Sequence, residues 1–88
     1  MVNTRRSELE IIEDILNLSK KGAKTTELLY QCNLSYSQCK NYLNFLIEKN
    51  IIKEDKVPNG DSHVIMFNIT PKGKNFLEDI KKTLGYIR

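Results

Sequence analysis

Apolar residues recur at helical spacing near the start of the chain, at Leu9, Ile11, Ile12, Ile15, Leu16 and Leu18. Ser7 and Glu10 form a capping-box pattern, in which two side chains satisfy otherwise unpaired backbone N–H groups at a helix start. Gly22 can adopt the left-handed conformation that ends a helix. The pattern predicts a helix over residues 7–21, with an apolar arc wider than the ~100° stripe that one packed face requires.

Two further helices are predicted close together. Thr25 or Thr26 can cap a short helix over residues 26–32. A third helix, over residues 36–49, begins after a short turn that ends at Ser35. Two helices separated by so short a turn indicate a helix-turn-helix.

The third predicted helix has an apolar and a polar side. Ser35 and Gln38 form a second capping-box pattern at its start. The apolar side carries Cys39, Tyr42, Leu43, Leu46 and Ile47. The other side carries Ser37, Asn41 and Asn44. Phe45 lies off the apolar side, so we expect it either to pack under the following hairpin, which we favour, or to join a protein interface.

A hairpin and a final helix complete the pattern. Residues 51–69 are predicted to form two antiparallel strands around a turn at Pro58-Asn59-Gly60-Asp61. Thr70 is expected to cap a last helix over residues 71–86. That helix carries apolar residues at the three-four-three spacing of a coiled-coil seam, namely Leu77, Ile80, Leu84 and Ile87.

The order of these elements predicts a mostly helical α+β fold of the winged helix-turn-helix class. It comprises three helices, a two-stranded β-hairpin wing and a C-terminal helix, in a single domain over residues 1–88. A domain of this size buries only about 60 to 65% of the surface of its unfolded chain. We therefore expect function to lie on the surface.

Composition favours an anionic partner only mildly. The chain has 14 Lys and Arg against 11 Asp and Glu, a formal net charge of +3. No apolar run approaches the ~20 residues that a membrane-spanning helix needs, and the first ten residues contain no signal-peptide core. We expect a cytoplasmic, nucleoid-associated protein without membrane contact.

Few residues could support catalysis or metal binding. Cys32 and Cys39 lack a further Cys or His pair at zinc spacing, so we expect free, buried thiols. His63 lies near a turn signal, directly after Asp61 and Ser62, and we expect it to be a surface residue rather than a ligand. We expect no enzymatic activity, metal, cofactor or small-molecule substrate.

Two stretches resemble known proteins. The stretch Asn33-Leu34-Ser35-Tyr36-Ser37-Gln38, with the helix that follows it, resembles the helix-turn-helix of small archaeal winged-helix DNA-binding proteins. The stretch Phe67-Asn68-Ile69-Thr70-Pro71-Lys72-Gly73 resembles the strand-to-helix junction of winged-helix regulators. The resemblance implies double-stranded DNA binding by a transcriptional regulator or chromatin component, often a dimer joined by its last helix. A winged helix that binds another protein within a transcription assembly is the alternative.

In this architecture the third helix enters the major groove, which carries the full donor and acceptor pattern of the bases. The expected base contacts are Ser37, Gln38, Asn41 and Asn44. The expected phosphate contacts are Arg5, Arg6, Lys24, Thr25, Thr26, Ser35, Tyr36 and Lys40. The wing would contribute Lys53, Lys56 and His63, and Lys20 and Lys21 add charge nearby. The alternative for each residue is a solvated surface position.

A homodimer is also expected. Its interface would combine the last helix with the outer side of the first, through Ile11, Ile15, Leu18, Leu77, Ile80, Leu84 and Ile87. Two recognition helices related by a two-fold axis could read half-sites about 34 to 36 Å apart. The alternative is that Phe76, Leu77 and Ile80 close the core of the monomer.

Overall fold

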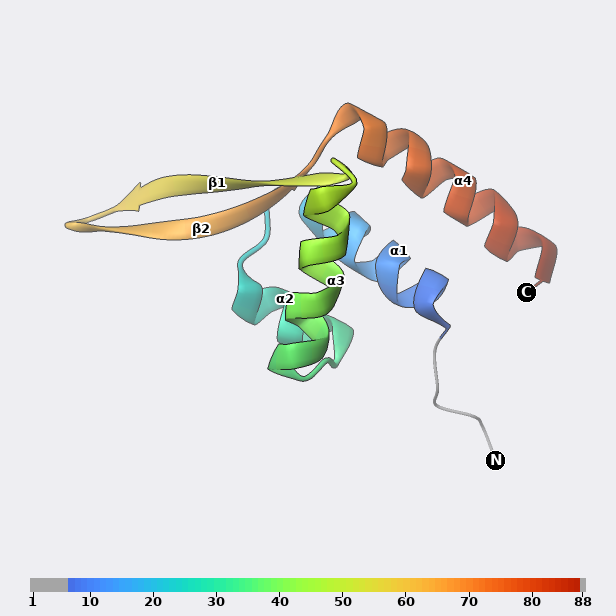
Figure 1. Cartoon of the computed structure of the whole chain (residues 1–88), viewed down its shortest axis with the longest axis horizontal. Helices are drawn as coiled ribbons and strands as arrows, with labels where there is room; N and C mark the ends of the chain where they lie inside the picture. The colour runs from blue at the N-terminus through green and yellow to red at the C-terminus, as the bar shows by residue number, and fades with distance from the viewer. Residues whose placement is uncertain (1–6, 88) are drawn as a thin grey trace.

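A computed structural model describes residues 7–87, which form four helices and one hairpin (Figure 1). In chain order the elements are α1 (Glu8–Ser19), α2 (Thr25–Cys32), α3 (Tyr36–Glu48), β1 (Ile52–Asn59), β2 (Ser62–Ile69) and α4 (Pro71–Ile87). The predicted winged helix-turn-helix architecture is confirmed, and the predicted helix bounds differ from these by at most two residues.

Two of the helix starts carry the predicted capping boxes. At α1 the backbone N–H of Glu10 donates to Ser7 Oγ at 3.2 Å, and that of Ser7 donates to Glu10 Oε1 at 3.1 Å. At α3 the corresponding distances between Gln38 and Ser35 are 3.2 and 3.0 Å. These reciprocal bonds satisfy N–H groups that a helix start otherwise leaves unpaired.

The predicted threonine cap of α2 is wrong. The helix begins one residue early, with Lys24 in the N-cap position and Thr25 as the first helical residue. The Lys24 backbone N–H donates to Glu27 Oε1 at 3.0 Å. A residue with helical backbone angles no longer has N-cap geometry, so the hydroxyl of Thr25 cannot cap this helix.

The helix-turn-helix depends on a left-handed residue at the end of each of its helices. Asn33 (φ 54°) ends α2 and Asn50 (φ 60°) follows α3, and no other non-glycine residue in the described part of the chain has a positive φ. Asparagine tolerates this region better than most residues with a Cβ. The two turns can therefore be tight enough to set α2 against α3 and α3 against the hairpin.

The wing is an antiparallel hairpin whose register runs from Ile52↔Ile69 to Asn59↔Ser62. Gly60 (φ 65°) and Asp61 form its two-residue turn, so Asn59 is the last residue of β1. Glycine in the first central position, with only that residue at positive φ, is the type II′ arrangement. Ala23 adds one antiparallel bridge to Phe67, with N···O distances of 3.0 and 2.8 Å.

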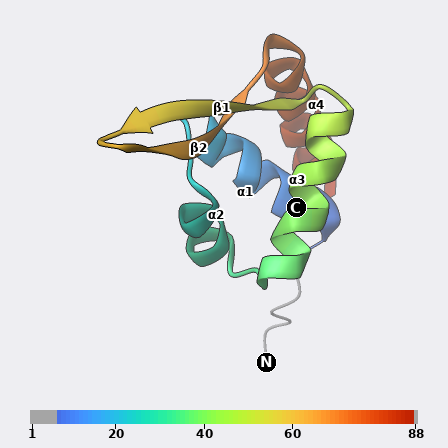
Figure 2. The ribbon, with the colours of Figure 1, turned by 60° about the vertical axis from the view of Figure 1, so that its left-hand side comes forward.

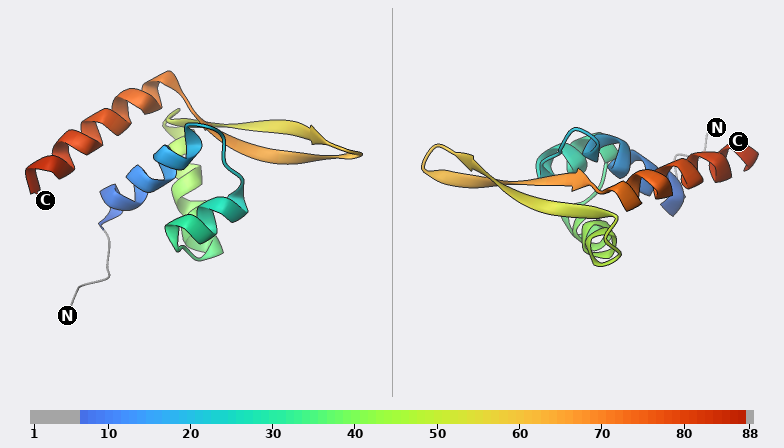
Figure 3. Two further views of the ribbon diagram at one scale, coloured as in Figure 1. Left: turned by 180° about the vertical axis from the view of Figure 1, so that it is seen from behind. Right: turned by 90° about the horizontal axis from the view of Figure 1, so that it is seen from above.

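The elements pack around one apolar cluster. It joins α1, α2, α3 and α4 to the base of the wing through buried residues that include Ile15, Leu28, Leu46, Ile52 and Leu84. The hairpin projects from one end of the molecule, and α4 runs alongside α1 towards the other end (Figures 1 and 3). Figure 2 shows α3 beside the base of the wing, with its outer side facing away from the other helices.

The start of α4 is bonded to the end of α3. Thr70 Oγ1 lies 2.7 Å from the carbonyl of Asn50 and 3.0 Å from that of Ile51, to which it can donate. The same hydroxyl accepts from the backbone N–H of Gly73 at 2.9 Å. Lys72 Nζ donates to the carbonyl of Lys49 at 2.9 Å. These bonds fix α4 against the segment that follows α3.

Replacing Thr70 with alanine is expected to lower the free energy of unfolding by about 1 to 2 kcal/mol, because a helix cap is lost and the carbonyl of Asn50 or Ile51 loses the hydroxyl donor. Thr70→Ser keeps the hydroxyl and should recover most of the difference. Urea unfolding followed by circular dichroism measures both. A serine variant as unstable as the alanine variant would contradict the role of the hydroxyl.

Candidate functional site

The exposed side of α3 is polar. Its buried side carries Cys39, Leu43 and Leu46. The opposite side carries four exposed residues that we call the outer face of α3, namely Ser37, Asn41, Asn44 and Glu48. Sequence reasoning identified the first three and missed Glu48, although helical spacing places it one turn beyond Asn44.

Gln38 lies to one side of the outer face. Its Oε1 accepts the backbone N–H of Ser35, and it lines a groove together with Asn41 and Phe45. The Gln38 side chain, which was expected to contact bases, is therefore already hydrogen-bonded within the capping box of α3. Among the hydrogen bonds of the described residues, none involves the side chain of Asn41 or Asn44.

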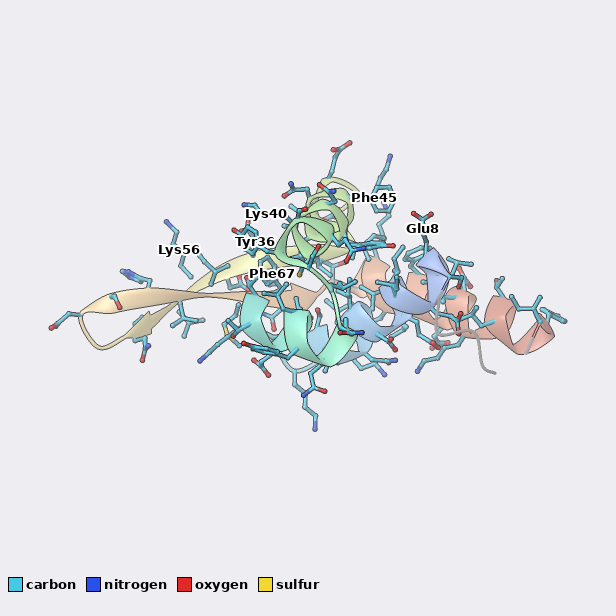
Figure 4. The ribbon with its side chains drawn as sticks, turned by 90° about the horizontal axis from the view of Figure 1, so that it is seen from below. Glu8, Tyr36, Lys40, Phe45, Lys56 and Phe67 are labelled. Atoms are coloured by element: carbon cyan, nitrogen blue, oxygen red, sulfur yellow. The ribbon has the colours of Figure 1, made fainter. Side chains whose placement is uncertain are left out.

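A cleft of about 220 Å³ separates α3 from the wing and is called here the α3–wing cleft. Its lining includes Tyr36, Lys40 and Asn44 from α3 and Glu54 and Ile65 from the wing. In Figure 4, Tyr36 and Lys40 lie on the side of α3 nearer the wing, and Lys56 projects from the wing in the same general direction. The cleft thus brings polar and charged side chains of two elements together.

The wing residues divide between its two faces. Residues paired across an antiparallel ladder lie on the same face, and faces alternate along each strand. Lys56 pairs with Ile65 and His63 with Pro58, so Lys56 and His63 share the face that leads to the α3–wing cleft. Lys53, paired with Asn68, lies on the other face, so the three predicted wing contacts do not share one face of the hairpin.

A second groove, of about 390 Å³, lies between α1 and α3. Phe45 lines it together with Glu8, Ile12 and Tyr42, and Figure 4 shows Phe45 on the side of α3 nearer Glu8 and away from the wing. The favoured expectation that Phe45 packs under the wing is wrong. Its helical position turns the ring towards α1, where it remains 47% exposed.

The remaining predicted phosphate contacts are spread over the turns. Lys24 and Thr26 are exposed at the start of α2, and Thr25 lines the α3–wing cleft. Ser35 accepts through its Oγ in the capping box of α3. Lys20 and Lys21 are exposed after α1. Arg5 and Arg6 lie outside the described residues.

Most of the predicted dimer seam is buried within the monomer. Four of its residues are at most 2% exposed, and they are Ile15, Leu77, Ile80 and Leu84. Ile11 and Leu18 are half-buried, and Ile87 is exposed. The seam prediction is therefore wrong for the four buried residues, because α4 uses its apolar spacing to pack against α1 in the same chain.

The thiols are packed in the core. Neither Cys32 nor Cys39 is in a disulfide bond, and both are fully buried. Burial raises the pKa of the Cys39 thiol by disfavouring the thiolate. Among residues 7–87 there is no group of three or more His, Cys, Asp or Glu residues placed to hold a metal ion. The same residues include no helix long and apolar enough to cross a membrane.

Over residues 5–86 the sequence matches the winged helix-turn-helix family. The chain belongs to this family. It is 31% identical over 87 residues to the uncharacterized protein MJ0290 of Methanocaldococcus jannaschii, covering 97% of this chain and 37% of that protein. It is 36% identical over 53 residues to MJ0287 of the same organism, covering 59% and 55%. The chain thus spans between about a third and about half of the length of these archaeal relatives.

Solved winged helices have the same fold as this one. A PadR family transcription regulator from Clostridium difficile R20291 superposes with a TM-score of 0.79 at 24% identity, over 88% of both chains. Sso10a-2, a DNA-binding protein from Sulfolobus solfataricus, gives 0.79 at 23% identity, over 92% of this chain and 81% of that one. At these identities the likeness establishes the fold.

Proposed function

We propose that this winged helix binds double-stranded DNA without enzymatic chemistry, as a transcriptional regulator or chromatin-associated protein. The observation that carries the proposal is the outer face of α3, an exposed polar surface on the side of the helix opposite its buried residues. A major groove about 12 Å wide admits such a helix. Ser37, Asn41 and Asn44 are then the base contacts, and Gln38 contributes only if its capping bond opens.

Cations beside the outer face support the proposal. Lys40 lines the α3–wing cleft, and Lys56 lies further along the wing on the face that leads to it. Both are exposed. With α3 in the major groove, the adjoining phosphates would pass these two lysines, and Tyr36 would add a hydroxyl donor.

We expect the affinity for duplex DNA to fall steeply with salt, because lysine contacts release counterions condensed on the phosphates. Two to four phosphate contacts predict a loss of roughly 10- to 150-fold between 50 and 200 mM salt. Fluorescence anisotropy of a labelled 20-base-pair duplex measures this loss. Folded protein that fails to bind at 50 mM salt would refute the proposal.

A matched pair of double variants locates the interface. Lys40→Glu with Lys56→Glu should weaken binding strongly and reduce the salt dependence. Lys81→Glu with Lys82→Glu makes the same change in net charge on exposed positions of α4. Equal losses from the two pairs would show that net charge, rather than this face, governs binding.

We also propose a homodimer, with the exposed end of α4 in its interface. Tyr86 is 91% and Ile87 73% exposed, an unusual pair of apolar side chains to leave in water at adjacent positions. Two linked recognition helices would multiply a weak monomer affinity.

Tyr86→Asp combined with Ile87→Asp is expected to convert a dimer into a folded monomer, because both side chains lie outside the monomer core. Sedimentation equilibrium at micromolar concentration measures the mass. Tyr30→Asp is the control, since Tyr30 is a comparably exposed residue on α2. A monomeric parent, or a double variant that stays dimeric, would contradict this interface. Leu84→Asp is unsuitable here, because a charge in the core would unfold the chain.

A protein-interaction winged helix is the second candidate function. The groove between α1 and α3, with the half-exposed ring of Phe45, is the observation that favours it. The anisotropy experiment separates the two functions, because a protein-binding module has no need of salt-sensitive affinity for duplex DNA.

A further inference from the structure

The wing turns a carboxylate towards α3. Glu54 pairs with Phe67 across the ladder, so the two side chains lie on the same face of the hairpin. Phe67 is buried on that face, and Glu54 lines the α3–wing cleft from the same strand position. The carboxylate is exposed, and Lys40 lines the cleft from the side of α3.

The position of Glu54 is electrostatically unfavourable for a surface that binds polyanions. Lys56, two residues further along β1, lies on the same face and would attract the phosphates that Glu54 repels. A carboxylate and a phosphate on either side of this cleft repel each other, and solvent and salt weaken this repulsion without removing it. Glu54 therefore offsets part of the attraction that Lys40 and Lys56 provide.

We propose that Glu54 holds the sequence-independent DNA affinity of this protein low, so that a duplex without base contacts is bound only weakly. The inference rests on the proposed DNA binding. Sequence-independent affinity comes almost entirely from phosphate contacts, whereas base contacts supply discrimination. A carboxylate beside the phosphate path weakens every duplex, so that only one with good base contacts to the outer face of α3 is held firmly. Both affinities fall by a similar factor, so the effect is lower occupancy of non-specific duplex at a given protein concentration.

Glu54→Gln tests the inference, with Glu78→Gln as its matched control. Both variants raise the formal net charge from +3 to +4, and Glu78 is an exposed residue of α4 away from the cleft. The probe is a labelled 20-base-pair duplex of arbitrary sequence, titrated by anisotropy at 50 and 200 mM salt. We expect Glu54→Gln to bind about fivefold more tightly than the parent at 50 mM salt, with a smaller gain at 200 mM. Glu78→Gln should change the affinity by less than about twofold.

The outcomes separate this inference from the function on which it rests. Equal gains from the two variants would overturn the role of Glu54 while leaving DNA binding intact. Weaker binding by Glu54→Gln would also overturn it, since the carboxylate would then be making a favourable contact. Absence of binding by the folded parent would remove the proposed function and the inference together. Urea unfolding of both variants confirms that the comparison is between folded proteins.

Discussion

Replacing Gly73 with alanine is expected to lower the free energy of unfolding by about 3 kcal/mol or more. A Cβ at this position would overlap the backbone carbonyl oxygen of Ile51 and lie 2.7 Å from Ile69 Cγ1. The carbonyl cannot withdraw easily, because it accepts the backbone N–H of Thr70 at 3.0 Å. Overpacking a core typically costs about 1 to 3 kcal/mol and more where backbone must move. Thermal unfolding should show a midpoint lowered by about 12 °C or more.

Gly85→Ala is the control for this prediction, since Gly85 lies in the same helix and nothing is within 4 Å of an added Cβ. Alanine in an exposed helical position should stabilise by roughly 0.5 to 1 kcal/mol relative to glycine. The two substitutions are thus expected to have opposite signs. A Gly73→Ala variant as stable as the parent would mean that α4 does not approach the end of α3 as closely as described.

Local patterns predicted most of this fold because their causes are local. The capping boxes at Ser7 and Ser35, and the Thr70 cap, depend on atoms three residues apart, so the sequence contains both partners of each bond. The start of α2 was misplaced at a threonine because Glu27 satisfies the Lys24 backbone instead. Either arrangement is compatible with the sequence pattern, and only the backbone angles decide between them.

Patterns that depend on tertiary contacts were harder to interpret. The three-four-three spacing of α4 suits a coiled-coil seam and intramolecular packing equally well, and Leu77, Ile80 and Leu84 turned out to be buried in the monomer. Helical spacing fixes the direction in which Phe45 leaves α3, but the sequence does not show whether the wing or α1 lies on that side.

The candidate site was only partly predictable. Alternation along β1 places Lys53 and Lys56 on opposite faces, yet which face meets α3 follows only from the packing of Phe67. Sequence reasoning looked for cations and amides and therefore missed Glu54. The available signal was its position two residues before Lys56, which places both side chains on one face of the strand.

Asn41→Ala is expected to weaken binding to a preferred duplex by about 1 to 3 kcal/mol, roughly 5- to 150-fold, if α3 lies in the major groove as proposed. Asn41 lies on the outer face of α3, and its amide can pair with two atoms of an adenine edge. The free energy of unfolding should change by less than about 0.5 kcal/mol, because the position is exposed and alanine suits a helix. The probe is a duplex that the parent enriches from a randomised pool, titrated against a scrambled duplex of the same length.

Gln38→Ala separates a loss of contact from a loss of helix structure. It removes the side chain that accepts the Ser35 backbone N–H, so it should destabilise the protein by about 0.5 to 1.5 kcal/mol. At temperatures where both variants are fully folded, we expect Asn41→Ala to lose more preference for the enriched duplex, because Gln38 lies beside the outer face rather than on it. If Asn41→Ala kept the parent's affinity and its preference over the scrambled duplex, base recognition would have to come from another surface. A parent that enriches no duplex would indicate binding through phosphates alone, with the polar outer face of α3 contributing no sequence discrimination.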